Sequence, residues 1–214
     1  MLTMLVSLSL DYNSLFGSIP SSLMGLTNLQ TLSLSHNSLV GTIPSEIGNL
    51  HQIMALQLRN NLFQGSIPIQ VGNLFNLVFI DLSYNSFSGV IPTQLLAHTN
   101  LAVILLSFNN LNGTFPLELG TDNNLRELAL LGNNLSGTIP ATFCQLHLQT
   151  FSVCFSNGTG CSQIQAVAPC LKGEYGSQFN LIANLTASPT LPTSPTSSSP
   201  SSKHLLAILV ICFI

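Results

Sequence analysis

The stretch LSLSHNSLVGTIPSEIGNL, residues 32–50, decides the architecture of this chain, because variants of it recur along the sequence at a constant period. Aligned on its asparagine, the stretch returns without insertion or deletion at Asn13, Asn37, Asn61, Asn85, Asn109 and Asn133. A glycine follows four positions after each asparagine, and an Ile-Pro or Phe-Pro pair begins two positions after that glycine. A fixed period of this length indicates an array of stacked structural repeats.

Each repeat contains a short segment in which apolar and polar residues alternate, as in Leu32-Ser33-Leu34. This alternation predicts a short strand with one buried face. Stacking of the repeats extends the strands into a parallel sheet whose leucines share one core. The expected buried pairs are Leu8/Leu10, Leu32/Leu34, Leu56/Leu58, Ile80/Leu82, Ile104/Leu106 and Leu128/Leu130. An apolar residue after each proline should close the outer side: Leu23, Ile47, Val71, Leu95, Leu119 and Phe143.

The recurrent asparagine stands where the chain turns off the strand. Its amide has two donors and an acceptor, so it can satisfy backbone groups of adjacent turns that would otherwise be buried unpaired. We therefore expect the six asparagines to form a hydrogen-bonded ladder. The glycine permits a tight backbone path, and the proline ends any helix or central strand.

The repeat LxxLxxLxLxxNxLxGxIP resembles that of the plant-type leucine-rich repeat family, and its LxGxIP half is specific to this subtype. The resemblance runs from Leu2 to about Val153. It implies an α/β solenoid, a right-handed superhelix with a concave parallel β-sheet, a second short strand at LxGxI and irregular or 3₁₀ structure outside. Six 24-residue repeats would be followed by a degenerate C-terminal turn, in which Leu148 and Val153 arrive one position early. Family members are typically cell-surface receptors, receptor-like kinases or secreted inhibitors that bind peptides, hormones or other proteins.

The composition excludes several functions. Only 5% of the residues are charged and the net charge is −3, so there is no basic patch for nucleic acid. The acidic residues and histidines are spread over different turns, and the sequence has no phosphate-binding glycine loop, nucleophile elbow or kinase motif. We predict that the chain is not an enzyme and has no catalytic residue, cofactor or metal site.

The outward positions of the concave strands form the face on which the family binds partners. In this chain they are small and polar in the early repeats and apolar in the later ones, and an exposed apolar patch often marks an interaction site. The candidate binding residues are Phe79, Asp81, Tyr84, Val103, Leu105, Phe108 and Leu131. Asp81 and Tyr84 are expected at the rim of this patch. The alternative is ordinary variation among the repeats, or a surface that another part of the protein covers. Elsewhere, His98 replaces a leucine at a turn edge and is expected to face solvent.

Four regions follow from the pattern. Residues 1–153 form the solenoid, without an N-terminal cap, so we expect that a natural N-terminal region is missing. Residues 154–172 form a cysteine-containing cap, residues 173–204 a Ser/Thr/Pro-rich stalk, and residues 205–214 a hydrophobic tail. The cap candidates Cys144, Cys154, Cys161 and Cys170 lack the close spacing of a zinc site and fit disulfide bonds. Of the three pairings, Cys161 with Cys170 and Cys144 with Cys154 is favoured. Four reduced cysteines in a cytosolic chain are the alternative.

Attachment to a membrane and to sugar is also indicated. Glycosylation sequons lie at Asn112, Asn134, Asn157 and Asn184. As a helix, the ten apolar residues 205–214 would be too short to cross a bilayer. Small residues, a polar spacer and an apolar tail make a glycolipid-anchor signal, which we favour over a transmembrane helix cut short at Ile214.

The sequence therefore predicts an extracellular protein- or peptide-binding module of a membrane-attached receptor-like protein at the plasma membrane, which takes part in recognition and signalling. The expected partners are a ligand on the concave face, a co-receptor kinase, and the membrane through the tail or a lipid anchor. Two alternatives remain open: an inhibitor of a secreted cell-wall-degrading enzyme, and a receptor-kinase ectodomain fragment with no independent function.

Overall fold

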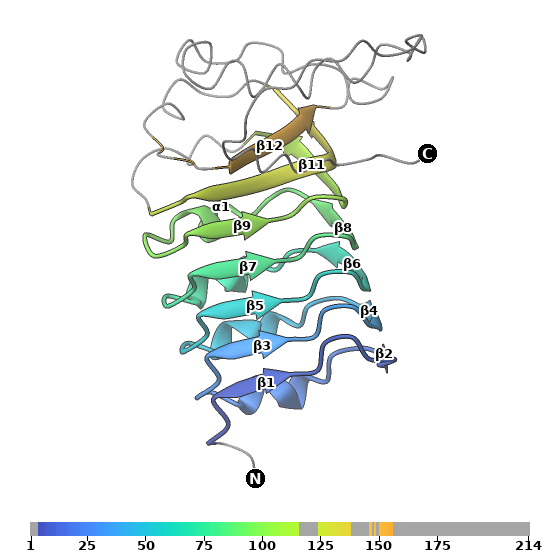
Figure 1. Cartoon of the computed structure of the whole chain (residues 1–214), viewed down its shortest axis with the longest axis vertical. Coiled ribbons are helices and arrows are strands. Elements are labelled where there is room, and N and C mark those ends of the chain that lie inside the picture. The colour runs from blue at the N-terminus through green and yellow to red at the C-terminus, as the bar shows by residue number, and fades with distance from the viewer. Residues whose placement is uncertain (1–3, 116–123, 138–145, 147, 149, 156–214) are drawn as a thin grey trace, which may run out of the picture.

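The computed structural model describes residues 4–115, 124–137, 146, 148 and 150–155, the last stretch by its backbone except at Val153. The chain coils into a stack of turns (Figure 1). Strands β1, β3, β5, β7 and β9 lie in one column, and β2, β4, β6 and β8 lie in a second column on the flank. All strand pairings are parallel, as the repeat pattern predicted.

The first strand of each turn belongs to what we name the concave sheet. Its members are β1 (Ser7–Ser9), β3 (Thr31–Ser33), β5 (Ala55–Gln57), β7 (Phe79–Asp81), β9 (Val103–Leu105) and the first part of β11 (Glu127–Ser136). Leu8 lies opposite Leu32, and Leu32 lies opposite Leu56, so neighbouring strands are offset by one full repeat. Residues at the same position of the repeat are therefore neighbours on this sheet.

The last described strand, β12 (Thr150–Phe155), pairs with β11. Leu128 lies opposite Phe151 and Leu130 opposite Val153, an offset one position short of a full repeat. The predicted final turn, which arrives one position early, is confirmed.

The second strand of each turn belongs to what we name the flank sheet. Its members are β2 (Phe16–Gly17), β4 (Ser38–Gly41), β6 (Leu62–Ser66), β8 (Ser86–Gly89), β10 (Asn110–Thr114) and residues 134–136 of β11. The second strand that the family resemblance implied is confirmed. Phe16 lies opposite Ser38 and Asn112 opposite Asn134, so the offset here is two positions short of a full repeat. Because β11 enters both sheets, it joins them into one continuous arrangement of strands.

The outer side of the stack carries short helices that begin directly after the prolines of the repeat. These are η1 (Ser21–Gly25), η2 (Ser45–Asn49), η3 (Ile69–Asn73) and α1 (Thr93–Leu96). Each proline is extended, with φ between −62° and −70°, which the pyrrolidine ring favours at a helix start. The predicted outer anchors Ile47, Val71 and Leu95 are buried and Leu23 is half-buried. Leu119 and Phe143 lie outside the described residues.

One hydrophobic core runs along the stack between the two sheets and the helices. The predicted strand pairs from Leu32/Leu34 to Leu128/Leu130 are buried in it. The first pair is an exception, because Leu8 is half-buried and Leu10 is 38% exposed. The prediction that Leu10 is buried is wrong, since β1 pairs on one side only within the described part of the chain.

The expectation that His98 faces solvent is also wrong. Its side chain is 8% exposed, and its Nε2 atom lies 3.1 Å from the carbonyl oxygen of Val71 in the preceding turn. Leu50 and Leu74 of this column are buried in the same stack, so a polar side chain here needs a hydrogen-bond partner inside. The backbone carbonyl of Val71 supplies it.

Candidate ligand-binding face

The asparagine column holds successive turns together. Asn61 donates from Nδ2 to the carbonyl oxygens of Leu34 at 2.9 Å and Leu58 at 3.1 Å, and its Oδ1 accepts from the amide of Leu39 at 3.0 Å. The same three bonds recur at Asn37, Asn85, Asn109 and Asn133. Among the described residues, Asn13 bonds only with carbonyls of its own turn. The ladder fixes the turns rigidly, and the concave face is built on that frame.

The early turns present a polar region centred on Asp11. Its carboxylate accepts hydrogen bonds from the hydroxyls of Ser9 and Ser33 and, at 2.7 Å, from the amide of Ser35. Partial burial acts to raise the pKa of Asp11, but the hydrogen bonds from Ser33, Ser9 and Ser35 together outweigh it and hold the pKa below its usual value. The charged form of Asp11 thus links the first two turns.

Arg59 and Tyr84 stand between the polar and apolar parts of the face. The Arg59 guanidinium donates from Nη1 to the hydroxyl of Ser83 at 3.2 Å. Its central carbon lies 4.5 Å from the centre of the Tyr84 ring, within cation–π distance. Tyr84 is 40% exposed. These contacts tie Arg59 to the next turn of the stack and leave part of the Tyr84 ring open to a ligand.

The later turns present the predicted apolar patch. Phe79 lies opposite Val103 on adjacent strands, and the Tyr84 and Phe108 rings stack with centres 4.4 Å apart. Phe79, Val103, Leu105, Phe108 and Leu131 are all half-buried. The structure thus gathers these residues on one surface across three strands, with part of each side chain open.

Asp81 differs from the prediction. It is buried, and its Oδ1 atom accepts from the backbone amide of Ser83 at 3.0 Å and from the Ser83 hydroxyl. The carboxylate is therefore occupied within its own turn. The prediction that Asp81 lies at an exposed rim is therefore wrong. The two hydrogen bonds from Ser83 offset the cost of burying the carboxylate.

A column of planar side chains borders this face. Tyr12, His36, Asn60, Tyr84 and Phe108 all have positive φ, between 53° and 57°. The left-handed backbone costs each non-glycine residue about 1–2 kcal/mol. Contacts between neighbours offset this cost: Tyr12 stacks on His36 with ring centres 4.1 Å apart, and Asn60 Nδ2 lies 3.1 Å from His36 Nδ1.

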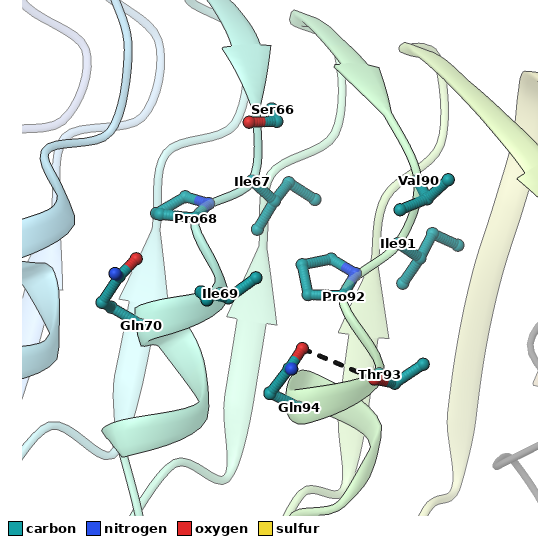
Figure 2. A pocket seen from close by; sticks show the side chains of 10 residues that line it. All are labelled: Ser66, Ile67, Pro68, Ile69, Gln70, Val90, Ile91, Pro92, Thr93 and Gln94. Atoms are coloured by element: carbon teal, nitrogen blue, oxygen red, sulfur yellow. Dashed lines mark hydrogen bonds between the residues drawn. The ribbon is translucent and has the colours of Figure 1, made fainter.

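Two features were missed from the sequence. The first is a groove of about 510 Å³ between turns three and four, lined in part by the exposed Ile69 and Val90; Figure 2 shows its lining side chains. Serine or threonine holds most of the corresponding places in the other repeats, and that difference was the available signal. The second is a ladder on the outer side, in which Asn76, Asn100 and Asn124 donate to backbone carbonyls of the preceding turn.

Several predicted sites lie outside the described residues: Cys144, Cys161, Cys170, Asn157 and Asn184. Cys154 is in β12, of which the structure gives the backbone there. Asn112 and Asn134 are exposed and lie within β10 and β11. None of the helices in the described part of the chain is long and apolar enough to cross a membrane. Nor do three His, Cys, Asp or Glu side chains gather there as metal ligands would.

Comparison with known proteins places this geometry in a family. Profiles of the leucine-rich repeat match residues 3–63, 76–97 and 124–146. The plant peptide hormone receptor RGFR1, solved in complex with RGF2, is 38% identical, with a TM-score of 0.66 over 67% of this chain and 23% of its own. The Arabidopsis receptor kinase HAESA, solved with the peptide hormone IDA and the co-receptor SERK1, is 39% identical, with a TM-score of 0.68 over 70% of this chain and 25% of its own.

The chain belongs to the plant-type leucine-rich repeat receptor-like family. This leucine-rich repeat protein spans a quarter or less of the length of those two receptor chains. A plant ice-binding protein is also similar, 30% identical with a TM-score of 0.59 over 71% of this chain and 56% of its own. No curated protein sequence matches the chain.

Proposed function

We propose that this leucine-rich repeat protein is the extracellular, non-catalytic ligand-binding module of a membrane-attached receptor-like protein, and that its concave face binds a peptide or protein. The observation that carries the proposal is the apolar patch of Phe79, Val103, Leu105, Phe108 and Leu131, in which Phe108 stacks on Tyr84 of the Arg59–Tyr84 pair. RGFR1 is a peptide hormone receptor, and HAESA was solved with a peptide hormone.

The dimensions of the face suit an extended peptide. Strands lie about 4.8 Å apart, so the six strands of the concave sheet span about 24 Å, the length of about seven residues of extended chain. Apolar side chains of the ligand would contact Val103 and Leu105, and polar groups would contact the Asp11 region. The half-buried side chains of the face have already lost most of their freedom, which lowers the entropic cost of binding.

The test is binding of the full chain to a displayed library of linear peptides, followed by one charge substitution on each sheet. Val103→Lys places an ammonium group in the apolar patch, and we expect the selected peptides to lose at least tenfold in affinity, about 1.4 kcal/mol. Val40→Lys is the matched control, because Val40 is 42% exposed on the flank sheet. Circular dichroism would verify that both variants fold.

Equal binding by wild type and Val103→Lys would contradict the proposal. So would equal losses in Val103→Lys and Val40→Lys, because the ligand would then not distinguish the two sheets.

Membrane attachment rests on the Ser/Thr/Pro-rich stalk and the apolar residues 205–214. We propose a glycolipid anchor, and a co-receptor kinase as the signalling partner, as HAESA was solved with the co-receptor SERK1. A phospholipase that cleaves glycolipid anchors should release the protein from intact cells. Retention on the treated cells would favour a transmembrane helix, and absence from the surface would contradict the extracellular setting.

A second candidate function is ice binding, which the flank sheet favours. The exposed side chains of β4, β6 and β8, strands that hold no charged residue, are Ser38, Val40, Leu62, Gln64, Ser66 and Ser86. Such a face has no charged side chains to bind water strongly, and its side chains repeat at the spacing of the strands. Thermal hysteresis of the purified chain would test it. Gln64→Lys should abolish the effect, whereas Val103→Lys on the concave sheet should leave it unchanged.

A further inference from the structure

Two of the sequons lie side by side on the flank sheet. In β10 and β11 Asn112 is paired with Asn134, Gly113 with Leu135 and Thr114 with Ser136, so the two triplets match residue for residue. Asn112, Thr114, Asn134 and Ser136 are all exposed on the same side, while Leu135 is buried. The hydroxyl of Ser136 donates to the carbonyl of Gly113 at 3.1 Å, which ties the two triplets together.

Neither sequon asparagine has a structural task within the described residues. Asn133, next in the chain to Asn134, is buried and donates to the carbonyls of Leu106 and Leu130. The side-chain amides of Asn112 and Asn134 point to the other side of the strand and make no hydrogen bond with another described residue. A sugar on either of them would therefore leave the asparagine ladder intact.

We propose that Asn112 and Asn134 form one glycosylation position, so that the folded protein carries an N-linked glycan on one of them and never on both. Adjacent strands are about 4.8 Å apart, and an N-linked glycan is a bulky, branched group. Two such groups on directly opposed residues of one face would occupy the same space next to the sheet. This inference rests on the extracellular setting proposed above, because the modification occurs in the secretory pathway.

The chemistry is ordinary transfer of an oligosaccharide from a lipid diphosphate donor. The side-chain amide nitrogen of asparagine attacks the first carbon of the sugar, forming a carbon–nitrogen bond and losing a proton. The bond between that carbon and the diphosphate oxygen breaks, and the lipid diphosphate leaves. A chain modified at both asparagines before folding could not bring β10 and β11 together with both glycans on one face. Only singly modified chains should reach the native state.

The experiment expresses the full chain behind a cleavable secretion leader in plant or insect cells, with Asn157→Gln and Asn184→Gln removing the other two sequons. The intact mass of the secreted, folded protein should correspond to one glycan per molecule. Thr114→Ala and Ser136→Ala each destroy one sequon without touching its asparagine. Each variant should keep one glycan, on the remaining site, and the double variant should have none.

A matched control comes from the same sheet. Gln64 is exposed in β6, two strands away from β10, and precedes Gly65-Ser66. Gln64→Asn therefore creates a third sequon at the repeat position of Asn112, about 10 Å from β10. Added to the background with both Asn112 and Asn134, this variant should carry two glycans, one at position 64 and one at the shared position.

Secreted, folded molecules with glycans on both Asn112 and Asn134 overturn the inference, and so do molecules with neither. Both results are independent of peptide binding at the concave face, which is measured on the same material. Loss of binding with one glycan present would contradict the proposed ligand, and double occupancy with binding retained would contradict only the shared site.

Discussion

The concave sheet and the flank sheet are built from the same turns, yet their strands are aligned differently. Neighbours on the concave sheet are offset by one full repeat, as in Leu32 opposite Leu56. Neighbours on the flank sheet are offset by two positions less, as in Gln64 opposite Ser86. Residues at the same position of the repeat are therefore direct neighbours on the concave sheet only. On the flank sheet, direct neighbours come from repeat positions that differ by two.

The asparagine ladder explains the difference. Asn61 Nδ2 reaches the carbonyl of Leu34 at the end of one concave strand, while Oδ1 accepts from the amide of Leu39 at the start of the adjacent flank strand. The second bond sets Asn61 beside Leu39, which is the shorter offset of the flank sheet. The side chain that holds the turns together thus also fixes the alignment of the flank sheet.

The largest expected effect on stability concerns side-chain packing on the inner side of the flank sheet. Phe63 and Phe87 are fully buried on its inner side, with rings 6.0 Å apart, where the concave strands use leucine or isoleucine. Phe63→Ala should lower the free energy of unfolding in urea by about 4 kcal/mol, because the cavity cannot close in a rigid stack. Phe63→Leu is the matched control, since Leu39 and Leu111 hold this position in other turns. It should cost about 1 kcal/mol.

If Phe63→Leu were as damaging as Phe63→Ala, the ring contact with Phe87, rather than the filled volume, would hold the flank sheet.

The second effect breaks the link between the sheets. Asn61→Ala leaves the buried amide of Leu39 without its partner and removes one of the two asparagine donors to the carbonyl of Leu34, which Asn37 still supplies. It should cost about 2–3 kcal/mol. Hydrogen exchange at Leu39 should accelerate more than at Leu56, which bonds within the concave sheet. Asn110→Ala, at an exposed position of the flank sheet, should change stability by less than about 0.5 kcal/mol. Unchanged exchange at Leu39 would show that strand pairing alone sets the shorter offset.

Much of this could be predicted from the sequence. The constant period predicted the concave strands and the buried leucines, and the early arrival of Leu148 and Val153 predicted the shifted final turn. The offset of the flank sheet could not be predicted, because a shift of a full repeat and a shift two positions shorter both keep the alternation of buried and exposed side chains. Leu39 and Leu111 point inward under either alignment. The hydrogen bonds of Asn61 distinguish the two alignments. These bonds depend on the positions of atoms in the folded chain and not on the pattern of polar and apolar residues.

The candidate site shows the same limit. Comparison of equivalent repeat positions correctly predicted that Phe79 lies next to Val103, because both lie on the concave sheet. It gave no indication that Asp81 turns to Ser83, because local side-chain bonds do not depend on the period. It also failed to bring Asn112 next to Asn134, because these positions differ by two places in the repeat.

A smaller effect tests how closely flank strands approach. Gly65 has φ +76°, and an added Cβ would lie 2.9 Å from the Thr42 methyl carbon, whereas Gly17 has φ +84° and open space. Gly17→Ala should cost about 1 kcal/mol from backbone strain alone. Gly65→Ala should cost about 2 kcal/mol, because the clash adds to the strain. Adding Thr42→Ser removes the methyl group and should return Gly65→Ala to the cost of Gly17→Ala. Equal costs for the two alanine variants would indicate that the strand of Thr42 simply moves away.

The smallest expected effect is a difference between the two sheets in how amide protection depends on pH. Asp11 anchors the polar region of the concave face, and the described strands of the flank sheet hold no charged residue. The pKa of Asp11 is lowered by folding, so its stabilisation is present above the unfolded value of about 3.9 and is lost as the pH falls through the folded pKa. Hydrogen-exchange protection of the Ser35 amide, which donates to Asp11, should therefore be greater in wild type than in Asp11→Asn at about pH 6, and the two should converge once the pH has fallen below the folded pKa of Asp11. Protection of the Leu39 amide, which donates to an uncharged asparagine, should stay equal in both proteins over the same range. A loss at Leu39 that follows the titration of Asp11 would mean that the first turns unfold together, so that the two sheets respond to acid as one unit.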